Sequence, residues 1–101
     1  INVGRIASVL CDQREPLQLL RMVSQFGGNF DMIIDDGSHL KEDQMITAAT
    51  LLPYLAYRGA YVIEDCYPDT AKELAGMFKG VVFEGQKSPD DCLVMIRRQG
   101  I

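Results

Sequence analysis

The chain has 101 residues, of which 48% are hydrophobic and 24% are charged, a balance typical of one soluble globular domain. Ten Lys and Arg against fourteen Asp and Glu give a net charge of −4, which disfavours nucleic-acid binding. No apolar run approaches the roughly 20 residues that a membrane-spanning helix needs, so the sequence predicts no membrane contact.

The three cysteines are an odd number and lie far apart, at Cys11, Cys66 and Cys92, without the paired spacing of a structural zinc site. We therefore expect reduced thiols and a cytoplasmic protein, and no disulfide framework. Because the chain begins with Ile1 and not with Met, we also expect it to be a piece of a longer protein.

Short apolar runs alternate with helical patterns along the first half of the chain. Residues 6–10 form an apolar run typical of a strand that is buried on both faces. A helical pattern then begins at Pro16, which a first turn tolerates, and stops at Gly27-Gly28. Residues 30–34 predict a second strand, and a second helix is expected from about Leu40 to Leu52.

The second half repeats the unit and then closes with a hairpin. Residues 60–63 predict a third strand, and Asp69 or Thr70 is expected to cap a third helix. Residues 81–83 and 93–96 are linked by a polar loop that is too short for a helix, so they should pair antiparallel. The prediction is a single α/β domain over residues 1–101: a Rossmann-like three-layer sandwich with a mainly parallel sheet, helices on both faces and an antiparallel C-terminal hairpin.

Carboxylates follow three successive predicted strands, at the edge of the sheet where α/β proteins bind ligands. They are Asp12, Asp35 with Asp36, and Glu64 with Asp65. Crowded carboxylates repel one another unless a cation compensates, so this pattern favours a hard divalent ion such as Mg²⁺, with Asp36 and Asp65 as ligands.

The turn after the second strand carries three further residues with separate tasks. Gly37 lets the chain turn sharply, Ser38 is expected to cap the following helix, and His39 stands where an imidazole can accept a proton near neutral pH. Asp, Gly and Ser are also ordinary turn and capping residues, and a single His is often merely solvated. Cys66 lies beside the same edge, but we do not expect it to be a nucleophile.

The stretch from Phe30 to Tyr67, "FDMIIDDGSHLKEDQMITAATLLPYLAYRGAYVIEDCY", resembles the class I S-adenosylmethionine-dependent methyltransferases, in the macrolide-sugar O-methyltransferase and cephalosporin-hydroxylase-like branch. The pair "IDDGSH" and "YVIED", separated by a helix, carries the resemblance. It implies metal-assisted methyl transfer from S-adenosylmethionine to a hydroxyl of a small molecule, with a sugar or natural product as the acceptor.

The resemblance also implies roles for individual residues. Asp36 and Asp65, with Glu64 beside them, match acids that hold Mg²⁺, although Mn²⁺ suits the same oxygen ligands. His39 matches the general base. The segment "CDQRE" resembles the element near the adenine of the cofactor, which makes Asp12 and Gln13 candidates for cofactor binding together with Asp35.

A glycine-rich loop and an acid for the cofactor's ribose, which open the domain in this family, do not precede residue 6. The chain is therefore expected to be the C-terminal half of the domain, inactive alone, lacking the first strands and open to homo-oligomerisation through an exposed sheet edge. Two other functions stay open. One is a non-catalytic remnant or interaction module; the other is a Mg²⁺-binding receiver-like signalling domain, although no Lys closer than Lys87 follows the later strands.

Overall fold

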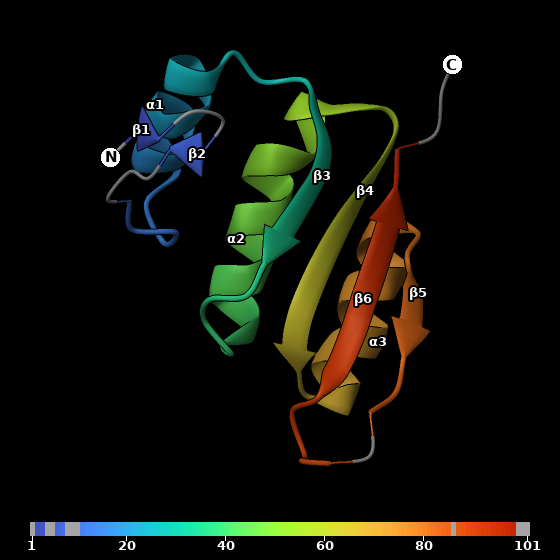
Figure 1. Cartoon of the computed structure of the whole chain (residues 1–101). Helices are drawn as coiled ribbons and strands as arrows, with labels where there is room; N and C mark the ends of the chain where they lie inside the picture. Colours follow the sequence, from blue (N-terminus) through green and yellow to red (C-terminus); the bar gives the residue numbers. More distant parts are fainter. Residues whose placement is uncertain (1, 4–5, 8–10, 86, 99–101) are drawn as a thin grey trace.

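The computed structural model describes residues 2–3, 6–7, 11–85 and 87–98. Four strands form a mixed sheet in the order β3-β4-β6-β5 (Figure 1). Their bounds are β3 Phe30–Asp35, β4 Leu55–Cys66, β5 Val81–Phe83 and β6 Cys92–Arg97. β3 and β4 are parallel, whereas β6 is antiparallel to both of its neighbours. The predicted α/β fold and its C-terminal antiparallel hairpin are confirmed.

The insertion of β6 between β4 and β5 distinguishes the observed sheet from a simple parallel one. β5 runs in the same direction as β3 and β4, but its hydrogen-bonded neighbour is β6, so β3 and β4 form the one parallel pair among the four strands described. This strand order brings the start of β6 next to the end of β4, where Cys66 is paired with Cys92. The loop before β6 therefore reaches the edge at which the candidate site lies.

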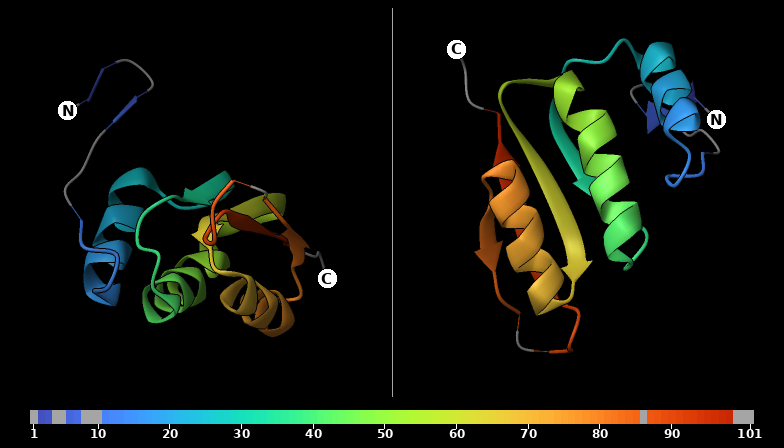
Figure 2. Two further views of the ribbon diagram at one scale, coloured as in Figure 1. Left: turned by 90° about the horizontal axis from the view of Figure 1, so that it is seen from below. Right: turned by 180° about the vertical axis from the view of Figure 1, so that it is seen from behind.

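Three helices form a single layer behind the sheet: α1 Pro16–Phe26, α2 Lys41–Leu51 and α3 Pro68–Phe78 (Figure 2). A short 3-10 helix, Leu52–Tyr54, joins α2 to β4. The sequence predicted helices on both faces, but the helices in the described part of the chain all cover the same face. None of them combines the length and apolar character required to cross a membrane.

The core lies between this helix layer and the sheet. It contains fully buried side chains from β4, α3 and β6, including Tyr61, Ile63, Leu74 and Val94. Side chains alternate along a strand, so Met32 and Ile34 of β3 point away from the helices and are 59% and 57% exposed. With Val81 and Phe83 of β5 they leave an apolar open face on the sheet.

The predicted first strand is only partly seen, and its pairing differs from the prediction. Ile6–Ala7 is strand β2, which pairs antiparallel with β1, Asn2–Val3, in a separate two-stranded sheet. The rest of the predicted strand, residues 8–10, lies outside the described residues. Pairing with a segment a few residues away costs less loop-closure entropy than pairing with β3, more than 20 residues further along the chain.

Two helix starts also differ in detail from the predictions. α3 begins at Pro68, before both Asp69 and Thr70. The first N–H groups of a helix have no partner within it, so proline, which has no N–H, is well suited to the first position. α2 begins at Lys41, so Ser38 is not its capping residue. Ser38 supports the first turn from outside, since its hydroxyl accepts a hydrogen bond from Leu40 N at 3.1 Å and donates one to Asp43 Oδ2 at 2.6 Å.

Candidate functional site

The turn after β3 is built around the buried carboxylate of Asp35. Asp35 Oδ1 accepts hydrogen bonds from Gly37 N at 3.2 Å and from Gln13 Nε2 at 3.3 Å. Burial nevertheless raises the pKa of Asp35, and the neighbouring charges of Asp36 and Asp43 act in the same direction, whereas the two hydrogen bonds oppose the shift. Asp35 therefore faces into the fold, where it fixes the turn.

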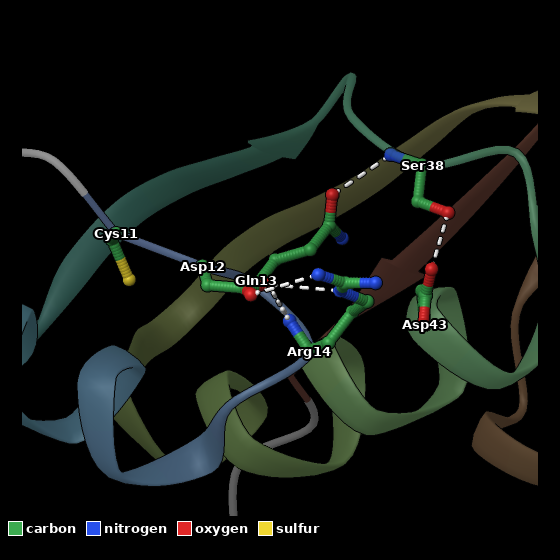
Figure 3. A pocket seen from close by; sticks show the side chains of 6 residues that line it. All are labelled: Cys11, Asp12, Gln13, Arg14, Ser38 and Asp43. Carbon is green, nitrogen blue, oxygen red and sulfur yellow. Dashed lines mark hydrogen bonds and ion pairs between the residues drawn. The ribbon is translucent and has the colours of Figure 1, made fainter.

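Gln13 connects this turn to two other segments. Its Oε1 accepts a hydrogen bond from Ser38 N at 2.8 Å (Figure 3). Its Nε2 donates to Thr47 Oγ1 of α2 at 2.9 Å. Thr47 Oγ1 in turn contacts Gln13 O at 3.2 Å. Both ends of the Gln13 amide are thus engaged within the protein, which ties the segment before α1 to the β3–α2 turn.

An open hollow of about 480 Å³ lies beside Gln13, lined by Cys11, Asp12, Gln13, Arg14, Ser38 and Asp43 (Figure 3). Arg14 donates from Nε and Nη2 to the two carboxylate oxygens of Asp12, each at 3.1 Å, and the pKa of Asp12 is lowered by these bonds. The hollow therefore has a polar wall in which Asp12 is ionised, and the two predicted cofactor residues Asp12 and Gln13 both line it.

The two predicted metal ligands Asp36 and Asp65 come together at the ends of β3 and β4. Their carboxyl groups are close enough to hydrogen-bond, and this contact is the main reason why the pKa of Asp65 is raised. A nearby carboxylate disfavours the charged form of a carboxyl group, which is the physical cause of this shift. The structure therefore brings these two predicted ligands together, and their role in metal binding stays a prediction.

His39 lies at the same edge, between two carboxylates. Its Nε2 is 3.9 Å from Asp65 Oδ2, and its Nδ1 is 2.6 Å from Asp90 Oδ2. Asp90 belongs to the loop before β6 and was not predicted from the sequence as a site residue. Its acidic neighbourhood, "SPDD", was visible, but only the strand order places this loop beside the end of β4.

The backbone at the end of β4 is irregular, and this irregularity aims Asp65. Asp65 has a positive φ of 59°, and the pairing register with β6 shifts between Ile63 and Cys66. Such bulges redirect side chains near functional sites.

Gln44 of α2 is fully buried beneath this segment, and its Nε2 donates to Ser38 O at 3.0 Å and to Glu64 O and Asp65 O at 3.4 Å each. Gln44 was also not predicted from the sequence as a site residue. It joins the β3–α2 turn to the end of β4.

The Glu64 carboxylate is not brought together with this pair. Within residues 11–85 and 87–98, no group of three or more His, Cys, Asp or Glu side chains is arranged to hold a metal ion. Glu64 takes part in the site through its backbone carbonyl, which accepts from Gln44. The carboxyl pair itself fits Mg²⁺, which is often held by one or two carboxylates while it keeps several waters.

Cys66 does not have the properties of a nucleophile. Its side chain is fully buried, and burial raises the pKa of its thiol to about 11. The reactive form of cysteine is the thiolate, so this residue is protonated and inert near neutral pH.

The raised pKa of Asp35 predicts a pH-dependent effect of Asp35→Asn. The fold penalises ionised Asp35, so this destabilisation is absent below the ordinary Asp pKa and becomes complete as pH rises through the raised value. We expect Asp35→Asn to gain stability relative to the unmodified chain over that pH window. Urea unfolding at a series of pH values measures this, with Asp31→Asn, at an exposed position of the same strand, as the matched control. A difference in stability independent of pH would contradict the assignment.

Comparison with known proteins finds relatives of one kind, although no protein-family model matches the chain. The mycinamicin VI 2''-O-methyltransferase of Micromonospora griseorubida is 34% identical over 88 residues, which are 87% of this chain and 20% of that protein. The demethylmacrocin O-methyltransferase of Streptomyces fradiae is 40% identical over 63 residues, which are 62% of this chain and 16% of that protein. The chain thus spans about a fifth of the length of these curated relatives.

Comparison with solved structures shows a shared fold. The MycE methyltransferase from the mycinamycin biosynthetic pathway, solved in complex with Mg and SAH, superposes with a TM-score of 0.66 and 23% identity. The match covers 97% of this chain and 34% of MycE. The chain is therefore similar in sequence and in fold to one segment of these O-methyltransferases.

Proposed function

We propose that this chain is the metal- and base-bearing segment of an S-adenosylmethionine-dependent O-methyltransferase that acts on a hydroxyl of a small molecule. One observation carries the proposal: Asp36, Asp65 and His39 lie together at the carboxyl edge of β3 and β4. The relatives include O-methyltransferases whose names specify a rhamnosyl tetracenomycin and an L-olivosyl oleandolide, both of which are glycosylated compounds. A sugar hydroxyl is therefore the acceptor class that we propose.

Two carboxylates and one imidazole suit this reaction. Asp36 and Asp65 would hold Mg²⁺, which supplies a positive charge that lowers the pKa of an acceptor hydroxyl. His39 accepts the hydroxyl proton, because a neutral imidazole is a base near pH 7. S-adenosylmethionine, when bound, would supply the methyl group that the hydroxyl oxygen receives. Gln44 and the β4 bulge hold the two carboxylate-bearing segments in register.

The predicted cofactor residues take different parts in this proposal. Asp12 stands in the wall of the open hollow with an ionised carboxylate, which can accept from an amino group such as that of adenine. Gln13 and Asp35 have their polar atoms engaged with each other and with Ser38 and Thr47. We therefore assign these two a supporting role, in which they shape the hollow.

We further propose that a longer protein supplies the remaining part of the fold, as the C-terminal-half prediction requires. The test is formation of S-adenosylhomocysteine by that longer protein from S-adenosylmethionine, Mg²⁺ and a glycosylated macrolide, followed by mass spectrometry. We expect product that disappears with EDTA and returns with Mg²⁺ or Mn²⁺. Product that is indifferent to EDTA would contradict the metal-assisted reaction, and its complete absence would favour a non-catalytic interaction module.

Isolated, the chain should self-associate through β3. This strand ends the order of the four-stranded sheet and exposes Met32 and Ile34. We expect the average mass in light scattering to rise with concentration, and Ile34→Lys to suppress the rise. Leu17→Lys on α1, where the native side chain is 76% exposed, is the control for an added charge. A monomer at high concentration would overturn this prediction.

A further inference from the structure

We propose that Asp90 is a positioning residue for His39, which holds the imidazole so that Nε2 is the free proton acceptor. This inference rests on the proposed function for its chemical meaning, but its geometry stands alone. The distance from His39 Nδ1 to Asp90 Oδ2 is 2.6 Å, within hydrogen-bonding range, whereas Nε2 lies 3.9 Å from Asp65 Oδ2. The two ring nitrogens therefore have unequal partners.

The loop that carries Asp90 is itself held in place. Asp91 Oδ2 accepts hydrogen bonds from Lys87 N and Ser88 N, and these bonds lower the pKa of Asp91. Ser88 Oγ donates to Asp90 Oδ1 at 3.1 Å. One oxygen of Asp90 is thus fixed by its own loop while the other faces His39. The hydrogen bond from Ser88 therefore limits the rotation of the Asp90 side chain that contacts His39.

The contact decides which nitrogen of a neutral imidazole carries the proton. A neutral ring has one N–H and one lone pair, and the hydrogen bond made by one nitrogen fixes the role of the other. Asp90 is an acceptor, so it selects the form with the proton on Nδ1. Free histidine prefers the proton on Nε2, the form that presents an N–H to the Asp36–Asp65 edge and cannot act there as a base.

The chain contains a single histidine, so its tautomer can be read without ambiguity. Long-range ¹⁵N–¹H NMR on the untagged chain, at a pH where the ring is neutral, distinguishes the protonated from the unprotonated nitrogen. We expect the proton on Nδ1 in the unmodified chain, a shift of the population toward Nε2–H in Asp90→Ala, and retention of the Nδ1–H form in Asp90→Asn, which keeps an acceptor oxygen.

The control variant is Asp69→Ala, which removes an exposed carboxylate from the first turn of α3 and should leave the tautomer unchanged. The proposal is overturned if the unmodified chain carries its proton on Nε2, or if Asp90→Ala keeps it on Nδ1. Because the spectrum needs no metal, cofactor or acceptor, its outcome is independent of the proposed function. Absence of methyl transfer would contradict the proposed function, but it would not change the tautomer result.

Discussion

Replacement of His39 by Ala should lower the rate of methyl transfer by about 100-fold or more in the longer protein that we propose contains this chain. Proton removal by a positioned side chain contributes ~10²–10⁴-fold to such reactions, and this chain has no second histidine to take over the task. His39 borders the carboxyl pair and not the hollow beside Gln13. The affinity for S-adenosylmethionine should therefore stay the same.

Single-turnover rates and cofactor titration separate these two quantities. Lys41→Ala is the matched control, because Lys41 is another basic residue close to the turn but pairs with Glu73 at 3.1 Å, away from the carboxyl pair. A rate for His39→Ala within threefold of the unmodified protein would remove His39 from the proposed reaction. Equal losses in both variants would indicate a general effect on the turn.

The second large effect is expected at Gly37, where an added methyl group has no room. A Cβ at this position would overlap Oε1 of Gln13, and its distance to Gln13 Cδ would be 3.1 Å. The Gln13 side chain can move aside, but it then loses its hydrogen bonds to Ser38 N and Thr47 Oγ1. We expect Gly37→Ala to lower the free energy of unfolding by about 1–3 kcal/mol, the cost of leaving partly buried polar groups unpaired.

A double-mutant cycle in urea tests this mechanism. If the cost of Gly37→Ala arises from displacing the Gln13 amide, the same substitution should cost much less in a Gln13→Ala background. Gly76→Ala in α3 is the control, because a Cβ there meets nothing within 4 Å and alanine is the better helix former. Equal costs of Gly37→Ala in both backgrounds would show that Gln13 is not the cause.

The sequence predicted the features that depend on local pattern. β3 and α1 lie within a residue of their predicted bounds, because a short apolar run and a Pro-to-Gly helix signature are read directly from neighbouring residues. The meeting of Asp36 with Asp65 also followed, since the carboxyl ends of parallel neighbours share one edge.

The features that depend on strand order were not predictable from one sequence. Nothing local states that β6 lies between β4 and β5, so the approach of Asp90 to His39 was missed. The bridging roles of Gln13 and Gln44 were hidden for a similar reason, because each has partners that lie 20 or more residues away in the sequence. The helix layer on one face differs from the prediction because strand–helix alternation does not say on which side each helix packs.

The most direct test of a cation site at Asp36 and Asp65 is an NMR titration of this chain with Mn²⁺, followed by displacement with Mg²⁺. Paramagnetic broadening detects weak binding and locates it. We predict that the amide signals of Gly37 and Cys66, which follow the two carboxylates, broaden first, that Mg²⁺ restores them, and that Asp36→Asn abolishes the effect while Asp69→Asn does not. Broadening that is spread over acidic residues throughout the chain, or that survives Asp36→Asn, would contradict the metal site and the reaction built on it.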